Sequence, residues 1–254
     1  MTVFSDTYYM FVRWMKKLAR NPILLFFSLF QPIIFLVLFT QLFANFGKFF
    51  GVSYVVFATS GIVLQNAFSS AFQSGTAVVD DIRSGFLTKM LATPASRASI
   101  LLGRLLSDAF RVTVQSIIIL VLAYALGVFP ATGLVGYPVV LLTVAFFGLA
   151  WSGISLALGL RTKSAETVFG IAGFLTFPLL FMSTALVTRQ AMGAAWMQSV
   201  SDYNPISITV DAIRAWISPG AFDLSKVFEA YGVIALISIV TLGATLYEFR
   251  KVVS

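Results

Sequence analysis

Long stretches without charge dominate the hydrophobic pattern of this chain. No Asp, Glu, Lys or Arg occurs in residues 21–47, 49–79, 112–160, 167–188 and 230–247. A helix that crosses a bilayer needs about 20 mostly apolar residues, so each stretch is long enough for a spanning helix. The third stretch is too long for one helix and breaks at a turn-forming cluster between Gly127 and Pro138. The pattern therefore predicts six spanning helices, at residues 22–46, 50–79, 108–127, 138–160, 166–188 and 228–248.

The rest of the pattern predicts an all-α membrane protein with a single transmembrane domain over residues 1–254. No internal repeat, low-complexity tract or flexible linker divides the chain. Only 11% of the residues are charged, against about 25% in soluble domains, which excludes a soluble enzyme and a disordered protein. Cysteine and histidine are both absent. We therefore expect no disulfide, no metal site and no catalytic residue in this chain.

Basic residues are distributed unevenly between the predicted loops. With the N-terminus inside, the inner segments are 1–21, 80–111, 161–166 and 248–254, and they hold 13 of the 17 Lys and Arg residues. Short cytoplasmic loops are enriched in Lys and Arg. The bias predicts a multi-pass protein of the cell membrane with both termini in the cytoplasm. It also accounts for the net charge of +7 without nucleic acid.

The segment at residues 1–21 has the pattern of an amphipathic helix. Its apolar side chains fall within about an 80° arc, and they are Phe4, Tyr8, Phe11, Met15 and Leu18. Its basic side chains gather on the opposite side, and they are Arg13, Lys16, Lys17 and Arg20. We expect this helix to lie in the inner interface, with the basic face toward anionic headgroups or a partner. It is either a membrane anchor or a lever between a cytoplasmic partner and the first span.

The predicted cytoplasmic loop, residues 80–107, combines charge with an apolar group. Phe86, Leu87, Met90 and Leu91 have the spacing of one short amphipathic helix. Thr93-Pro94 ends that helix, and Ser96 can cap a second helix that runs toward the third span. Exposed apolar residues on a short helix indicate a docking site for a partner. The alternative is an interfacial helix that rests on lipid.

The outer segment, residues 189–227, is less apolar than the spans. We predict two short helices there, near 191–201 and 206–217, in which Asp211 and Arg214 can pair on one helix face. The segment is either an ordinary outer loop or a re-entrant cap over a central cavity.

Polar and aromatic side chains within the spans are candidates for the lining of a transport pathway. They are Gln31 and Gln41 in the first span, Gln65, Ser69 and Gln73 in the second, and Phe174, Phe177 and Phe181 in the fifth. Gln65, Ser69 and Gln73 form a stripe with a spacing of four residues. Hydrogen bonding between helices is the alternative role for the polar members. Glycines in the fourth and fifth spans are expected to allow close packing of helices, and they are Gly148, Gly153, Gly159, Gly170 and Gly173.

Three motifs resemble the permease subunit of a type 2 ATP-binding-cassette exporter, the class of daunorubicin-resistance, antibiotic and lipid exporters. The first motif lies at Arg83–Arg97 and is followed by Leu101-Leu102-Gly103. The second lies at Phe177–Ser183. The third lies at Asn204–Arg214 and includes Asn204, Pro205 and Asp211. The six spans and inner termini match as well. This family often has an acidic residue just after the first motif's glycine, where this sequence has Phe86.

The resemblance implies that the loop helix is a coupling helix, which docks on a separate ATPase. Its contact residues would be Arg83, Gly85, Phe86, Leu87, Lys89, Met90, Leu91, Thr93, Pro94 and Arg97. Replacing Leu87 and Met90 with Asp would then block docking and leave the chain folded. The helix at residues 1–21 would be the connecting helix. Two permease subunits, most simply identical, would form the pathway with two ATPase copies, and ATP and Mg²⁺ would bind to those partners. The cargo would be a hydrophobic or amphipathic drug, antibiotic, lipid or glycoconjugate.

Other functions are less well supported by the residues. No G-x-x-x-x-G-K-[S/T] phosphate loop occurs, so this chain is not expected to hydrolyse ATP itself. An ion-coupled secondary transporter or a channel is the alternative. Such transporters usually place an acidic residue inside a span, whereas Asp108 and Glu166 are predicted at cytoplasmic ends. An intramembrane enzyme would need paired catalytic groups, which the pattern does not provide.

Overall fold

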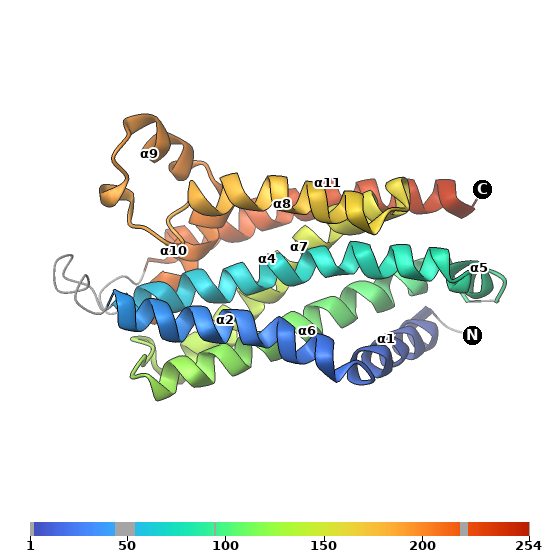
Figure 1. Cartoon of the computed structure of the whole chain (residues 1–254), viewed down its shortest axis with the longest axis horizontal. Coiled ribbons are helices and arrows are strands. Elements are labelled where there is room, and N and C mark those ends of the chain that lie inside the picture. Colours follow the sequence, from blue (N-terminus) through green and yellow to red (C-terminus); the bar gives the residue numbers. More distant parts are fainter. Residues whose placement is uncertain (1–2, 44–53, 94, 219–222, 254) are drawn as a thin grey trace.

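The computed structural model describes residues 3–43, 54–93, 95–218 and 223–253. All regular secondary structure in these ranges is helical, as predicted (Figure 1). The helices are α1 (Val3–Ala19), α2 (Pro22–Leu42), α4 (Tyr54–Arg83), α5 (Phe86–Leu91), α6 (Arg97–Ala125), α7 (Gly136–Thr162), α8 (Ala165–Phe181), α9 (Ala195–Asp202), α10 (Pro205–Ile217) and α11 (Leu224–Val253). Two short 3₁₀ turns, η1 (Gly133–Val135) and η2 (Arg189–Ala191), connect them.

Five stretches of helix in the described residues are long and apolar enough to cross a membrane. They are Leu25–Leu42, Tyr54–Arg83, Arg97–Ala125, Gly133–Thr162 and Leu224–Lys251. The remaining predicted span, at 166–188, contains the apolar helix α8, which has 17 residues and ends at Phe181. A side chain from another helix meets the end of α8: the Asn204 amide donates hydrogen bonds to the carbonyl oxygens of Leu179 (2.7 Å) and Met182 (3.1 Å). These bonds satisfy carbonyl groups that a helix end otherwise leaves without partners.

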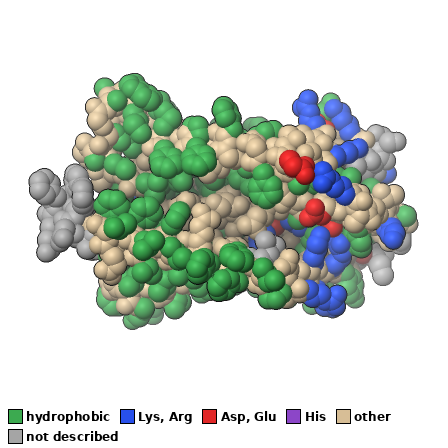
Figure 2. All heavy atoms as spheres, in the orientation of Figure 1, with side chains coloured by type: hydrophobic (Ala, Val, Ile, Leu, Met, Phe, Trp, Pro, Cys, Tyr) green, Lys and Arg blue, Asp and Glu red, His purple; other side chains and the backbone are tan. Residues whose placement is uncertain are grey.

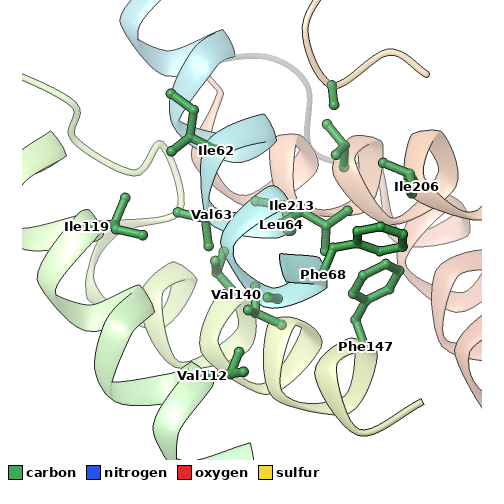
Figure 3. Close-up of a cluster of buried hydrophobic side chains, with 14 of the residues drawn as sticks. Ile62, Val63, Leu64, Phe68, Val112, Ile119, Val140, Phe147, Ile206 and Ile213 are labelled. Carbon is green, nitrogen blue, oxygen red and sulfur yellow. The ribbon is translucent and has the colours of Figure 1, made fainter. Parts of the chain in front are cut away.

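Helix α4 lies at the centre of the bundle and packs against α2, α6, α7, α8 and α10. The main core contains buried residues of α2, α4, α6, α7, α8, α10 and α11, and Figure 3 shows part of it. Phe68 of α4 and Phe147 of α7 contact each other in this core, and both rings also contact the indole of Trp151. Ile213 of α10 lies in the same cluster (Figure 3). The buried apolar face of α4 therefore fixes the positions of its neighbours.

Glycines let α7 approach three other helices closely. A Cβ atom on Gly148, Gly153 or Gly159 would lie within contact distance of α6, α11 or α4 respectively, which confirms the prediction for these three positions. The prediction is wrong for Gly170 and Gly173 of α8, because no described atom outside the helix lies within 4 Å of a Cβ built there.

The two ends of the bundle differ in charge. The first turn of α1, the short helix α5 and the last turn of α11 lie at one end (Figure 1). Figure 2 shows that Lys and Arg side chains gather at this end, whereas apolar side chains cover much of the visible face elsewhere. We call it the basic end. Helices α9 and α10 lie at the opposite end.

Candidate functional site: the basic end and a polar cavity

A tight turn places α5 at the basic end. Helix α4 ends at Arg83, and Gly85 then adopts a left-handed conformation with φ 66°. Residues with a Cβ atom rarely adopt this conformation, so glycine suits the turn. Helix α5 has six residues, and the Thr93 hydroxyl donates a hydrogen bond to the carbonyl oxygen of Met90 (2.6 Å) after its last turn. Pro94 lies outside the described residues. The Ser96 side chain accepts a hydrogen bond from Ser99 N (3.1 Å), which confirms the predicted cap of α6.

The prediction that α5 exposes its apolar group is wrong for its two central members. Leu87 is only 3% exposed and Met90 only 4%. Both belong to a second core at the basic end, whose other buried members are Val78, Ile100, Leu101, Leu105, Leu156, Leu160 and Phe249. Phe86 and Leu91 are half-buried against this core. These side chains hold α5 on the bundle and do not present it to a partner.

The exposed surface of the turn and of α5 is polar and basic instead. Its described residues include Arg83, Ser84, Thr88, Lys89, Thr93 and Arg97. Arg83 forms a surface ion pair with Glu166 at the start of α8 (3.3 Å). The Glu166 carboxylate also accepts a hydrogen bond from the Ser164 hydroxyl (2.8 Å). A partner that docks here therefore meets hydrogen-bonding and positively charged groups.

Basic side chains of helix α1 contact α5 and the end of α4. The guanidinium of Arg13 lies 3.5 Å from the ring centre of Phe86 and within 3.8 Å of a carboxylate oxygen of Asp81. Lys17 Nζ donates to the same Asp81 oxygen at 2.9 Å. Burial lowers the pKa of Arg13, and the negative charge of Asp81 opposes that effect. The Phe86 ring thus lies directly against the Arg13 guanidinium.

The basic face of α1 is only partly as predicted. Lys16, Lys17 and Arg20 are exposed, whereas Arg13 is half-buried, and both Arg13 and Lys17 pair with the buried Asp81. The apolar side chains Phe4 and Tyr8 are exposed, at 89% and 62%. An amphipathic helix with one packed face and one exposed apolar face is suited to the membrane interface.

Three charged side chains in α6 are buried, and the sequence prediction missed them. Asp108 forms ion pairs with Arg104 (3.2 Å) and Arg111 (3.3 Å), and all three residues are at most 7% exposed. Ser74 of α4 donates a short hydrogen bond to Asp108, and Arg111 donates to the carbonyl oxygen of Ser70 (2.6 Å). Helix α6 begins at Arg97, so Asp108 lies well inside the helix and not at its start. The spacing of Arg104, Asp108 and Arg111 on one helix face was the available signal.

Four of the predicted pathway residues come together in one polar cavity. Gln31 of α2 and Gln65, Ser69 and Gln73 of α4 line a cavity of about 190 Å³ between these two helices. Gln65 Oε1 is buried there without a hydrogen-bond partner among the described residues, whereas Gln73 Oε1 accepts from Arg111 (3.2 Å). The neighbouring amide of Gln115 instead joins α6 to α2 and α4 through Ser28 and Ser70. Both predicted roles, cavity lining and bonding between helices, therefore occur side by side.

The other four pathway candidates lie elsewhere. Gln41 is exposed near the end of α2 and does not line the cavity. Phe174, Phe177 and Phe181 lie along the exposed side of α8, and the last two rings stack at 5.8 Å between centres. They offer an apolar surface and no enclosed site in the isolated chain.

A buried arginine organises the opposite end. Asn204 caps α10 by accepting from Ile206 N (2.9 Å), and Pro205 occupies its first turn, as their types predict. Arg214 pairs with Asp211 at 3.0 Å, which confirms the predicted pair. The same guanidinium donates to Ser60 Oγ (3.1 Å) and to the carbonyl oxygen of Thr184 (2.7 Å). Burial lowers the pKa of Arg214 to about 10 despite the nearby Asp211, so it stays charged at neutral pH.

Comparison with known proteins identifies the family. Residues 5–217 match the family described as ABC-2 type transporter. The chain belongs to this family. It is 29% identical over 233 residues to the daunorubicin resistance ABC transporter permease protein DrrB1 of Streptomyces coeruleorubidus, a match that covers 91% of this chain and 82% of that protein. It is also 32% identical over 225 residues to a protein of Cyanophora paradoxa named as the transport permease ycf38, with 82% and 75% covered.

A third relative has a name of the same kind. A protein of Mycobacterium tuberculosis named as the doxorubicin resistance ABC transporter permease DrrC is 27% identical over 215 residues, which cover 82% of this chain and 75% of that protein. With the five membrane-length helices, these matches show an ABC transporter permease of a membrane.

Proposed function

We propose that this ABC-2 chain is the membrane-spanning subunit of an exporter driven by a separate ATPase. The cargo is a hydrophobic or amphipathic molecule, such as a drug, an antibiotic, a lipid or a glycoconjugate. The observation that carries the proposal is α5, a short helix fixed to the bundle at the basic end with a polar and basic outer surface. The names of the drug-resistance relatives support export.

The proposed orientation places the basic end in the cytoplasm. Lys and Arg concentrate at this end, and short cytoplasmic segments are enriched in these residues. Both termini then lie in the cytoplasm of a cell with this protein in its plasma membrane, and α9 and α10 lie on the outer side. A cytoplasmic ATPase can reach α5 directly in this arrangement.

The packing of α5 gives the proposed ATPase a mechanical connection to the spans. Leu87 and Met90 tie α5 to side chains of α4, α6, α7 and α11, and Arg13 ties it to α1. Because closely packed side chains resist compression, a push on α5 moves these helices together. Two ATPase copies would close on ATP and Mg²⁺ and drive two α5 helices.

The proposed pathway runs along the face formed by α2, α4 and α8. Polar side chains of α4 line the cavity beside α2, and the phenylalanines of α8 flank α4 with an apolar surface. A mixed lining of this kind suits an amphipathic cargo. A second permease subunit, most simply an identical copy, would close the pathway from the other side.

Co-purification tests this function directly. The tagged chain is expressed in its natural host, purified in mild detergent, and the proteins that accompany it are identified by mass spectrometry. We expect a phosphate-loop ATPase at about one copy per permease, with hydrolysis stimulated by hydrophobic compounds. A stable chain without an ATPase, which transports in response to an ion gradient, would support the ion-coupled transporter or channel instead.

Truncating Gln65 is expected to change the choice of cargo more than the assembly of the complex. Gln65→Ala removes an amide whose oxygen has no partner among the described residues, so polar cargo should lose a contact worth about 1 kcal/mol, or roughly fivefold in apparent affinity. Phe177→Ala should act in the same way on aromatic cargo. The measurement is cargo-stimulated ATP hydrolysis over a series of compounds. Gln190→Ala, at an exposed site of η2, is the control, and identical profiles for all variants would assign Gln65 and Phe177 to packing.

A further inference from the structure

A second cavity lies at the basic end, beside the proposed pathway, with which it shares only Gln73 among the lining residues of the two cavities. It has a volume of about 340 Å³, at the lower limit for small-molecule sites. Its walls come from α1, α4, α6 and α8, and its charged members are Lys17, Asp80, Arg104, Asp108 and Arg111. These residues carry three positive charges and two negative charges.

The buried part of this wall has more positive than negative charge. Arg104 and Arg111 share one carboxylate, that of Asp108, whereas Asp80 is exposed. Lys17 is already bound to Asp81, which also faces Arg13. A buried charge is costly unless an opposite charge or hydrogen bonds compensate it. One buried guanidinium at this site therefore lacks a counter-charge among the described residues.

The buried polar atoms of the cavity lining that lack a hydrogen-bond partner are both hydrogen-bond donors. Trp14 Nε1 and Arg111 Nε are both buried and make no hydrogen bond with the described residues. Both are donors only. Each atom is covered in this conformation, so a ligand reaches it after a small rotation of the side chain. A ligand that satisfies both must be an acceptor, and the surplus positive charge calls for an anion.

The surroundings of the cavity indicate a lipid anion. Helix α1, which forms one wall, exposes Phe4 and Tyr8 on its outer side, as expected for a helix at headgroup level. Phe169 of α8 lines the cavity and is 58% exposed, so the cavity leads from the buried arginines to an apolar outer surface. We propose that the phosphate of an anionic phospholipid binds between Trp14, Arg104 and Arg111, with its acyl chains outside along α8. This inference does not depend on the transport reaction.

Arg104→Gln tests the site because it removes the surplus charge and leaves Asp108 paired with Arg111. The full chain with its accompanying subunits is placed in discs of phosphatidylcholine, alone or mixed with phosphatidylglycerol, and its Tm and retained lipid are measured. We expect phosphatidylglycerol to raise the Tm of the wild type and to be retained. Arg104→Gln should bind it at least about tenfold more weakly, measured per folded protein, and phosphatidylglycerol should no longer raise its Tm above the value in phosphatidylcholine. Arg161→Gln, an exposed change at the same end, should behave as the wild type.

A second variant and a measurement with soluble phosphate complete the test. Trp14→Phe keeps an aromatic ring near Arg104 and removes the N–H donor, so retention should fall about threefold even if Arg104→Gln does not fold. Unchanged retention in the variants that fold would overturn the proposal, as would an equal loss in Arg161→Gln. Inorganic phosphate that raises the Tm in phosphatidylcholine as much as phosphatidylglycerol does would show that a soluble anion fills the cavity.

Discussion

Lys89→Glu is expected to abolish association with the ATPase while the permease stays folded. Lys89 lies on the exposed face of α5, beside Thr88, and makes no ion pair with the described residues. The basic surface of α5 favours an acidic facing surface on the ATPase, so reversing this charge places like charges together and costs about 1.4 kcal/mol of binding free energy or more. The measurement is the ratio of ATPase to permease after co-purification, which should fall by about tenfold or more.

A matched pair of buried changes separates docking from folding. Leu87→Asp combined with Met90→Asp is expected to lower the yield of folded permease itself, because it places two unpaired carboxylates in the core at the basic end. This result differs from the sequence-based prediction, in which these changes affected docking alone. Normal ATPase recovery with Lys89→Glu, together with folded permease lacking ATPase for the buried double variant, would contradict our assignment of the two faces.

Gly75→Val is expected to prevent stable packing of α4 on α7. A Cβ atom at Gly75 would overlap the backbone oxygen and the hydroxyl of Ser155. The same hydroxyl accepts from Gly75 N and donates to the carbonyl oxygen of Phe72, both at 2.8 Å. Overpacking a well-packed core costs about 1–3 kcal/mol and occasionally more, and here it acts against backbone that cannot rotate away. We expect a cost of about 3 kcal/mol or more.

The measurement for Gly75→Val is the fraction of monodisperse protein in detergent and its Tm. Gly170→Val in α8 is the control, because no described atom outside the helix lies within 4 Å of a Cβ at that position. The control should have a Tm equal to that of the wild type or slightly above it, because valine has a higher helix propensity than glycine. A Gly75→Val protein with the Tm of the control would show that α4 and α7 can separate without loss of stability.

Local signals in the sequence predicted the helix boundaries well where a cap determined them. Ser96 and Asn204-Pro205 start their helices as their residue types indicate, and each of the five membrane-length helices overlaps an uncharged stretch. The end of α8 depends instead on Asn204, which is 23 residues beyond Phe181 in the chain. A hydropathy profile depends only on neighbouring residues and cannot include this contact, so the predicted span continued to residue 188.

The candidate site was predicted in its location and only partly in its contacts. Periodicity showed that Leu87 and Met90 share a face, but it could not say whether that face meets solvent or the bundle. The same limit applied to Arg13 and Lys17, which face Asp81. The charged side chains of α6 were missed because a window without charges begins only after Arg111. The hydropathy pattern counts every charged residue as exposed, so it could not predict that Arg104 and Asp108 pair with each other and are buried.

The short length of α8 has a consequence for the membrane around it. At 1.5 Å per residue, its 17 residues rise about 26 Å, less than the roughly 30 Å thickness of a hydrocarbon core. Lipids that border a short hydrophobic segment thin locally to match it. In the proposed orientation, the bilayer would therefore be thinner beside α8, next to the face where cargo is proposed to pass. Local thinning of the bilayer shortens the apolar distance that the polar part of an amphipathic molecule must cross.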